Sequence, residues 1–187
     1  RSRGLGDVYK RQVAVEEVVK ALEAARWAPS AHNAQPWRFI VLASREARRR
    51  LAEAMAEAWV EDLVSDGVEV EAAREAAARS VRLIVDSPLA VLAAASMKEA
   101  RRHGQRRRSL AEKLMMVQSV AAAIQNLLLA LHAQGLASCW LCAPLFCREV
   151  VKKTLGLPRY VEPQALIIIG RPGETPVPPP RRPLSQV

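Results

Sequence analysis

The longest apolar stretch of the chain, residues 110–134, restricts the possible folds more than any other feature. It opens with Ser109-Leu110-Ala111-Glu112, the serine-to-glutamate spacing of a capping box, and Gly135 follows its last residue. Because most of its sides are apolar, we expect a central helix buried within the domain or in a subunit contact. Polar residues interrupt every run long enough to span a membrane, so we expect no membrane segment and a soluble protein.

The remaining pattern is a mixture of helices and strands. Helical spacing of apolar residues predicts a helix from Val15 that stops at Pro29, and further helices over 44–63, 70–84 and 145–155, the first of these with Ser44 as N-cap. Short apolar runs predict strands over 37–42, 89–95, 137–142 and 165–169. The strands do not alternate regularly with the helices. We therefore expect an α+β fold, in which helices flank a mixed or antiparallel sheet.

The chain is long enough for one domain with a substantial core, because it has 187 residues and a hydrophobic content of 50%. Residues 2–12, however, resemble the in-frame translation of a transposon-type sequencing adapter. We expect residues 1–12 to be an artefact and residues 13–187 to be a domain truncated at its N-terminus. Removing residues 1–12 takes away four Arg or Lys and one Asp, so the formal charge falls from +9 to about +6.

Much of the basic charge is concentrated in one segment, which contains Arg101, Arg102, Arg106, Arg107 and Arg108. No aromatic residue on which a nucleic-acid base could stack lies among them. We interpret the segment as a solvated loop or helix end, with a nucleic-acid patch as the less favoured alternative.

Three cysteines, Cys139, Cys142 and Cys147, lie close together, and no secretory signal precedes them. An odd number of cysteines fits a reducing cytoplasm. The spacing of Cys139 and Cys142 matches a redox motif, but the pair lies within a strand pattern and does not open a helix. Zinc would need further ligands. We therefore expect buried structural cysteines, with thiol redox chemistry as the alternative.

Several enzyme classes lack their motifs in this sequence. It contains no glycine-rich dinucleotide fingerprint, phosphate-binding P-loop, nucleophile elbow or zincin helix. With only three histidines, a histidine-based triad has few candidates. Common hydrolase and kinase functions are therefore not indicated.

Residues 25–39, with the sequence ARWAPSAHNAQPWRF, closely resemble the flavin loop of the nitroreductase family. Further stretches follow in the family's order: Ser87-Pro88 before an apolar strand, QSVAAAIQNLLLAL over 118–131, GLASCWLCAPLF over 135–146, LGLP over 155–158 and IIGRP over 168–172. The resemblance runs from Val13 to the C-terminus. Among branches, it looks most similar to the flavoprotein domain attached to the deazaflavin-coenzyme gamma-glutamyl ligase.

The resemblance implies FMN as the cofactor and an intertwined homodimer. It implies that Pro29, Ser30, Ala31 and Asn33 contact a flavin bound mainly by the partner subunit; a tight turn without a ligand is the alternative. Gln35 is expected to hold this turn together. In the second stretch, the backbone of Trp140, Leu141, Cys142 and Ala143 is expected to lie against the flavin ring, where one amide bonds the reactive nitrogen.

Charged contacts to the flavin are implied at three arginines. Arg182 or its neighbour Arg181 matches the family's C-terminal basic residue for the phosphate, which a guanidinium can bind bidentately. Arg82 is a candidate for the cation near the pyrimidine edge of the ring, or else an exposed surface residue. The family's N-terminal Arg-Arg-Ser phosphate motif has no counterpart here, because adapter-like residues occupy its place.

The predicted activity is therefore an FMN-dependent oxidoreduction with a ping-pong mechanism. A reduced nicotinamide or deazaflavin donor reduces the flavin, and a small acceptor such as a nitroaromatic or quinone takes up the electrons. No side chain is assigned as a catalytic acid or base. Two alternatives are a flavin-sequestering protein with little turnover and a basic nucleic-acid-binding module.

Overall fold

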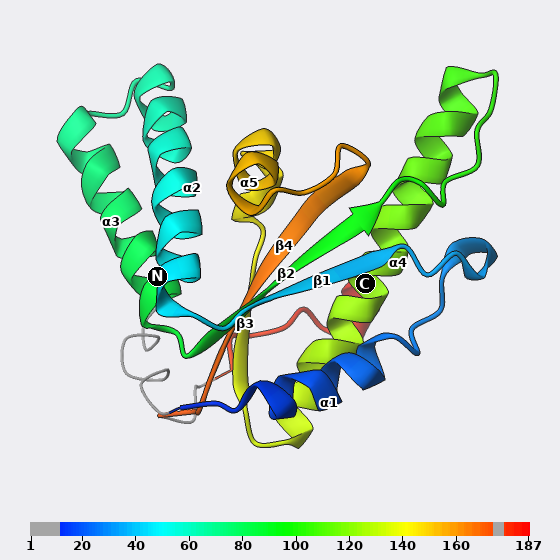
Figure 1. Cartoon of the computed structure of the whole chain (residues 1–187), viewed down its shortest axis with the longest axis horizontal. Helices are drawn as coiled ribbons and strands as arrows, with labels where there is room; N and C mark the ends of the chain where they lie inside the picture. Colours follow the sequence, from blue (N-terminus) through cyan, green and yellow to red (C-terminus); the bar gives the residue numbers. More distant parts are fainter. Residues whose placement is uncertain (1–11, 174–177) are drawn as a thin grey trace.

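The computed structural model describes residues 12–173 and 178–187 (Figure 1). The adapter-like segment, apart from Gln12, and part of the proline-rich tail lie outside these residues. The elements are, in chain order, α1 (Val15–Ala25), η1 (Ala31–Asn33), β1 (Trp37–Leu42), α2 (Arg45–Ser65), α3 (Val70–Asp86), β2 (Leu89–Ser96), α4 (Arg106–Ala133), β3 (Ala137–Leu141), η2 (Ala143–Leu145), α5 (Arg148–Leu155), β4 (Val161–Gly170) and η3 (Leu184–Gln186).

The four strands form one sheet in the order β1-β2-β4-β3, and every neighbouring pair is antiparallel. All eight residues of β2 are buried, because β1 and β4 flank it and helices cover both faces. The register between β2 and β4 shifts between Ala93 and Ala94, where Pro163 pairs with Ala94 and Gln164 is the extra residue. A bulge at this point lets the strand continue through a proline, which cannot donate a ladder hydrogen bond. The α+β prediction is confirmed.

The helices lie in two layers on either side of the sheet (Figure 1). On one face, α1 packs against α4, and their buried side chains share a core with alternate residues of the strands. On the other face, α2, α3 and α5 enclose a second core. The predicted role of residues 110–134 as a central helix is confirmed, since Met116, Ile124, Leu127 and Leu131 of α4 are fully buried.

By length and composition, α4 could also cross a membrane, and within the described residues it is the one helix that meets this test. Polar residues interrupt this helix as expected, although its length and composition alone still meet the test. Its apolar character has a simpler explanation in the fold, because its inward side chains fill the core between the sheet and α1. We conclude that α4 is the core helix of this domain.

The predicted capping box at the start of α4 is wrong. The helix begins one turn earlier, at Arg106, with Gln105 as N-cap. Ser109 lies inside the first turn and its hydroxyl donates to the carbonyl oxygen of His103, at 3.0 Å. The carboxylate of Glu112, the other member of the predicted box, has different partners, which are described below.

Other boundaries differ by a few residues. Ser44 caps α2 as predicted, since its hydroxyl accepts from the Ala47 amide at 3.1 Å. The predicted helix over 145–155 starts at Arg148, because residues 143–145 around Pro144 form a separate 3-10 turn. The last strand begins at Val161, four residues before its predicted start, because the bulge accommodates Pro163.

Candidate functional site

The loop between α1 and β1, which resembles the family's flavin loop, has an unusual backbone. His32, Asn33 and Gln35 have φ angles of 56°, 52° and 47°, in the left-handed region, although none of them is glycine. Each such residue costs on the order of 1–3 kcal/mol, which favourable contacts with its surroundings must offset. A loop that keeps three of them must be fixed by specific contacts.

Hydrogen bonds within the loop and to α4 provide these contacts. The Gln35 amide donates to the Ser30 hydroxyl at 3.0 Å, and the Gln35 side chain donates to Asn33 Oδ1 at 3.3 Å. The Ala31 amide donates to the hydroxyl of Ser119 on α4, at 3.1 Å. Gln35 thus holds the turn as predicted, and the exposed side-chain amide nitrogen of Asn33 has no acceptor among the described residues.

A buried carboxylate of α4 also holds the loop against this helix. The Glu112 side chain is only 7% exposed, and its Oε1 lies 3.4 Å from His32 Nε2 and 3.2 Å from His103 Nε2. Its Oε2 accepts from the Arg101 amide, at 3.4 Å. The hydrogen bond from His103, supported by those from Arg101 and His32, lowers the pKa of Glu112 below its ordinary value. This anchor was not predicted; its signal in the sequence is a lone carboxylate within an apolar helix.

The second predicted contact region lies where β3 ends and η2 begins. Trp140 and Leu141 of the edge strand β3 and Ala143 of η2 are half-buried, and Cys142 is exposed. The amides of Cys142 and Ala143 donate to no acceptor among the described residues, since Ala143 opens a short helix and the ladder with β4 ends at Leu141. Two unpaired backbone donors are therefore available at this turn.

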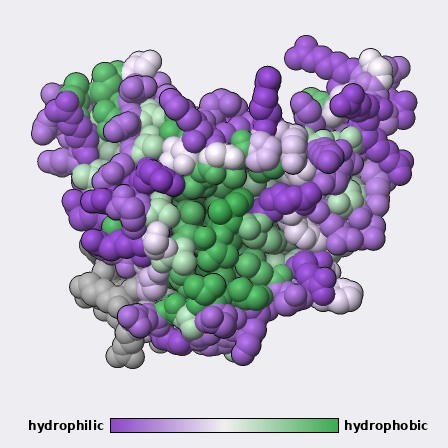
Figure 2. All heavy atoms as spheres, viewed as in Figure 1, coloured by the Kyte–Doolittle hydropathy of each residue, from purple (hydrophilic) through white to green (hydrophobic). Residues whose placement is uncertain are grey.

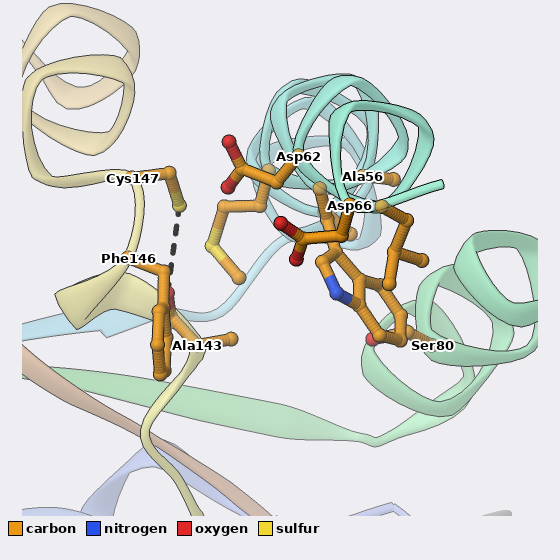
Figure 3. A pocket seen from close by; sticks show the side chains of 11 residues that line it. Ala56, Asp62, Asp66, Ser80, Ala143, Phe146 and Cys147 are labelled. Atoms are coloured by element: carbon orange, nitrogen blue, oxygen red, sulfur yellow. Dashed lines mark hydrogen bonds between the residues drawn. The ribbon is translucent and has the colours of Figure 1, made fainter. Parts of the chain in front are cut away.

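A cavity of about 410 Å³ adjoins this turn and separates it from α2 (Figure 3). Its lining residues are Ala52, Met55, Ala56, Trp59, Asp62, Leu63 and Asp66 of α2, Ser80 of α3, and Ala143, Phe146 and Cys147. Most of the wall is apolar, and the Asp62 and Asp66 carboxylates project between α2 and the η2–α5 segment (Figure 3). Its size lies in the range of small-ligand sites.

The cysteines differ from the prediction that all three are buried and structural. Cys142 is exposed, because it follows the last residue of an edge strand, whereas Cys139 and Cys147 are half-buried. All three are free thiols. Burial, together with the nearby Asp62 carboxylate, raises the pKa of Cys147, and its thiol donates to the Ala143 carbonyl oxygen at 3.5 Å. A thiol that stays protonated is a weak nucleophile.

The remaining predicted site residues lie elsewhere. Arg82 is exposed on α3, in a groove that it shares with Glu57 and Glu61 of α2. Ala56 lines both this groove and the cavity beside Ala143, but Arg82 does not line the cavity. Arg181 and Arg182 are exposed in the C-terminal tail. Within one chain, η1 packs on α4 and η2 packs on β4 and α5, so the two predicted flavin contacts are not brought together. The basic residues of the 101–108 segment are all exposed, before and in the first turn of α4.

Comparison of the chain with known proteins identifies its family. The model of the nitroreductase family matches residues 9–171 of the chain. The chain belongs to the nitroreductase family. Two archaeal proteins, both named "Putative NADH dehydrogenase/NAD(P)H nitroreductase", are similar to it. The Archaeoglobus fulgidus protein is 27% identical over 166 residues, covering 87% of this chain and 76% of the relative. The Methanothermobacter thermautotrophicus protein is 29% identical over 178 residues, covering 93% and 75%.

Solved structures share the fold of this nitroreductase-family chain. A BluB-like flavoprotein from Clostridium difficile 630 matches with a TM-score of 0.74 and 24% identity, covering 96% of this chain and 90% of that one. Iodotyrosine deiodinase bound to FMN and 3-iodo-L-tyrosine matches with a TM-score of 0.71 and 21% identity, again covering 96% and 90%. The arrangement of the sheet between two helical layers is therefore the family's arrangement.

Proposed function

We propose that this chain is a subunit of an FMN-dependent oxidoreductase that passes electrons from a reduced nicotinamide or deazaflavin donor to a small organic acceptor. The observation that carries the proposal is the pair of unpaired amides at Cys142 and Ala143, beside a cavity of about 410 Å³, in a chain of the nitroreductase family. Backbone donors stabilise charge on a reduced flavin ring without supplying a competing acid.

The residues present fit the chemistry of FMN. The cofactor offers hydrogen-bond acceptors on its ring, for which the Cys142 and Ala143 amides and the Asn33 side chain are suitable donors. It also carries a phosphate dianion, for which Arg181 and Arg182 are exposed and available. Arg82 remains a proposed cation for the ring edge. Bound FMN would supply hydride-transfer chemistry in two separate half-reactions, one with the donor and one with the acceptor, as a ping-pong mechanism requires.

The proposal includes a homodimer in which each flavin is shared between two subunits. The loop at Pro29–Asn33 and the turn at Cys142 lie apart within one chain, so a shared cofactor would need the loop of one subunit and the turn of the other. Figure 2 shows a broad apolar area in the middle of one face, where Figure 1 shows the sheet and the α1–α4 pair. Exposed Leu110 and Leu114 lie in the N-terminal part of α4, which reaches beyond the sheet (Figure 1).

We place the protein in the cytoplasm, where its free thiols stay reduced.

Absorbance and steady-state kinetics test the proposed activity. The protein, purified and incubated with FMN, should retain a yellow flavin and oxidise NADH in the presence of a quinone or nitroaromatic acceptor. Double-reciprocal plots at several acceptor concentrations should be parallel, as a ping-pong mechanism requires. Retained flavin without turnover would instead support a flavin-sequestering protein, and steep salt-dependent DNA affinity without flavin would support a nucleic-acid-binding module.

Two substitutions separate flavin chemistry from thiol chemistry. Asn33→Leu should reduce both flavin retention and turnover, because a polar partner on the flavin loses its hydrogen bond. Cys142→Ser should preserve activity within a few-fold, because the proposal uses only its backbone amide. An inactive Cys142→Ser protein with a full complement of flavin would contradict the assignment and favour the thiol alternative.

A further inference from the structure

The cavity beside Ala143 carries negative charge in a chain whose formal charge is +9. Asp62 and Asp66 are its charged lining residues, and no lysine or arginine of the described chain lines it. Neither carboxylate forms an ion pair with a described residue. Both aspartates are exposed to solvent, and their negative charge beside this cavity contrasts with the basic overall composition.

The position of these carboxylates in α2 is electrostatically unfavourable. Asp62 lies in the last turn of the helix and Asp66 is its C-cap, at the end where the helix dipole is negative. They are four residues apart, so they also repel each other across one turn. The last turn contains no basic residue to offset this charge. The two carboxylates and the negative end of the helix dipole thus lie together at one wall of the cavity.

The rest of the lining is mostly apolar and partly aromatic. Trp59 precedes Asp62 by about one turn of α2, and Phe146 lies across the cavity, next to η2 (Figure 3). These two residues remain 41% and 81% exposed, so their rings are accessible to a ligand. Aromatic faces attract organic cations, and apolar walls of this kind accommodate a ring system. The lining therefore combines an aromatic surface with two carboxylates.

We propose that this cavity binds the acceptor and selects aromatic compounds that carry a positively charged ammonium group. The ring would lie against Trp59 and Phe146, and the ammonium group would lie between Asp62 and Asp66. The two carboxylates disfavour a phosphate in this cavity, because the charges have the same sign. This inference rests on the proposed function, because only a flavin bound next to the cavity could reduce the acceptor. The cavity adjoins Ala143, whose unpaired amide is one of the proposed flavin contacts.

Three nitro compounds of similar size and different charge test the selectivity: 4-nitrobenzylamine, 4-nitrobenzyl alcohol and 4-nitrobenzoate. With NADH as donor, kcat/KM should be about tenfold higher for the cation than for the neutral alcohol, and lowest for the anion. The Asp62→Asn/Asp66→Asn variant should lose this preference, so that its kcat/KM values for the cation and the alcohol become similar. High salt should weaken the preference in the unaltered protein.

The matched control is Glu61→Gln. Glu61 also belongs to α2, but its side chain lines the neighbouring groove next to Arg82 and not the cavity. It should keep the full preference for the cation. Thermal unfolding of both variants checks the fold; the double aspartate variant should be at least as stable as the unaltered protein, because repulsion at the helix end is relieved.

Calorimetry with benzylamine, which cannot be reduced, separates this inference from the proposed function. Benzylamine should bind the unaltered protein and bind the double aspartate variant about tenfold more weakly, whether or not any nitro compound is turned over. Equal binding to both proteins, or equal kcat/KM for the cation and the alcohol, would overturn the inference. Absence of turnover with all three compounds would count against the proposed function alone.

Discussion

Glu112 is the residue whose removal tests the anchoring of the loop between α1 and β1 most directly. Its carboxylate accepts from His32, His103 and the Arg101 amide, and these bonds lower its pKa. Glu112→Gln should therefore destabilise the protein at neutral pH and loosen the loop. Because the folded-state pKa lies below the ordinary value of 4.5, the stabilising contribution is present above that pH and is lost as the pH falls through the lowered value.

Urea denaturation of Glu112→Gln and the unaltered protein checks this pH dependence. The difference in unfolding free energy should be present above pH 4.5 and should shrink as the pH falls below this value. Glu23→Gln, which removes an exposed carboxylate paired with Arg26, serves as the control and should show little difference at any pH. A difference for Glu112→Gln that is independent of pH would mean that its charge does not hold the loop.

The three thiols should also react in a defined order. Cys142 is exposed, whereas burial raises the pKa values of Cys139 and Cys147 and limits access to them. Iodoacetamide at neutral pH should therefore modify Cys142 first. Mass spectrometry of peptides at increasing reaction times measures the order, and earlier modification of Cys147 would show that its thiol is more accessible than the structure indicates.

At the scale of elements, Arg48 joins α2 to the end of β1. Its guanidinium is buried and donates to the carbonyl oxygens of Leu42 and Ala43 at 3.0 and 2.9 Å. Arg48→Ala removes charged hydrogen bonds and should lower the unfolding free energy by about 1.5–3 kcal/mol. The melting temperature should fall by several degrees, while the exposed Arg50→Ala should change it little. Equal effects of both substitutions would contradict the role assigned to Arg48.

Most of the elements could be predicted from the sequence, because helical and strand periodicities are local. The boundaries that depend on distant partners could not, such as the start of β4 at Val161, where a bulge against β2 accommodates Pro163. The loop was located through its resemblance to the family, but its left-handed residues were not predicted, since glycine is absent there. The Glu112 anchor was missed because His32 is 80 residues away in the sequence.

At the scale of the whole molecule, the proposed homodimer makes the clearest prediction. Leu110 and Leu114 lie one turn apart on α4 and are 68% and 55% exposed. If these side chains are buried between subunits, each leucine contributes about 1.5–3 kcal/mol to the free energy of dimer formation. Leu110→Glu/Leu114→Glu should remove this contribution and give monomers that retain flavin poorly. Light scattering measures the mass. The control Val64→Glu/Val68→Glu changes exposed residues at the end of the α2–α3 hairpin and should leave a dimer.

The strand order has a consequence for how the protein is made on the ribosome. β4, the last strand in the described chain, occupies an inner position in the sheet, and β3 pairs with β4 alone among the described strands. Until residues 161–170 have been synthesised, β3 therefore lacks its partner and β2 has an open, alanine-rich edge. Such unpaired edges favour aggregation, and distant pairings slow folding. A nascent chain that stalls before Val161 should depend on chaperones, whereas one released after Gly170 can complete the sheet.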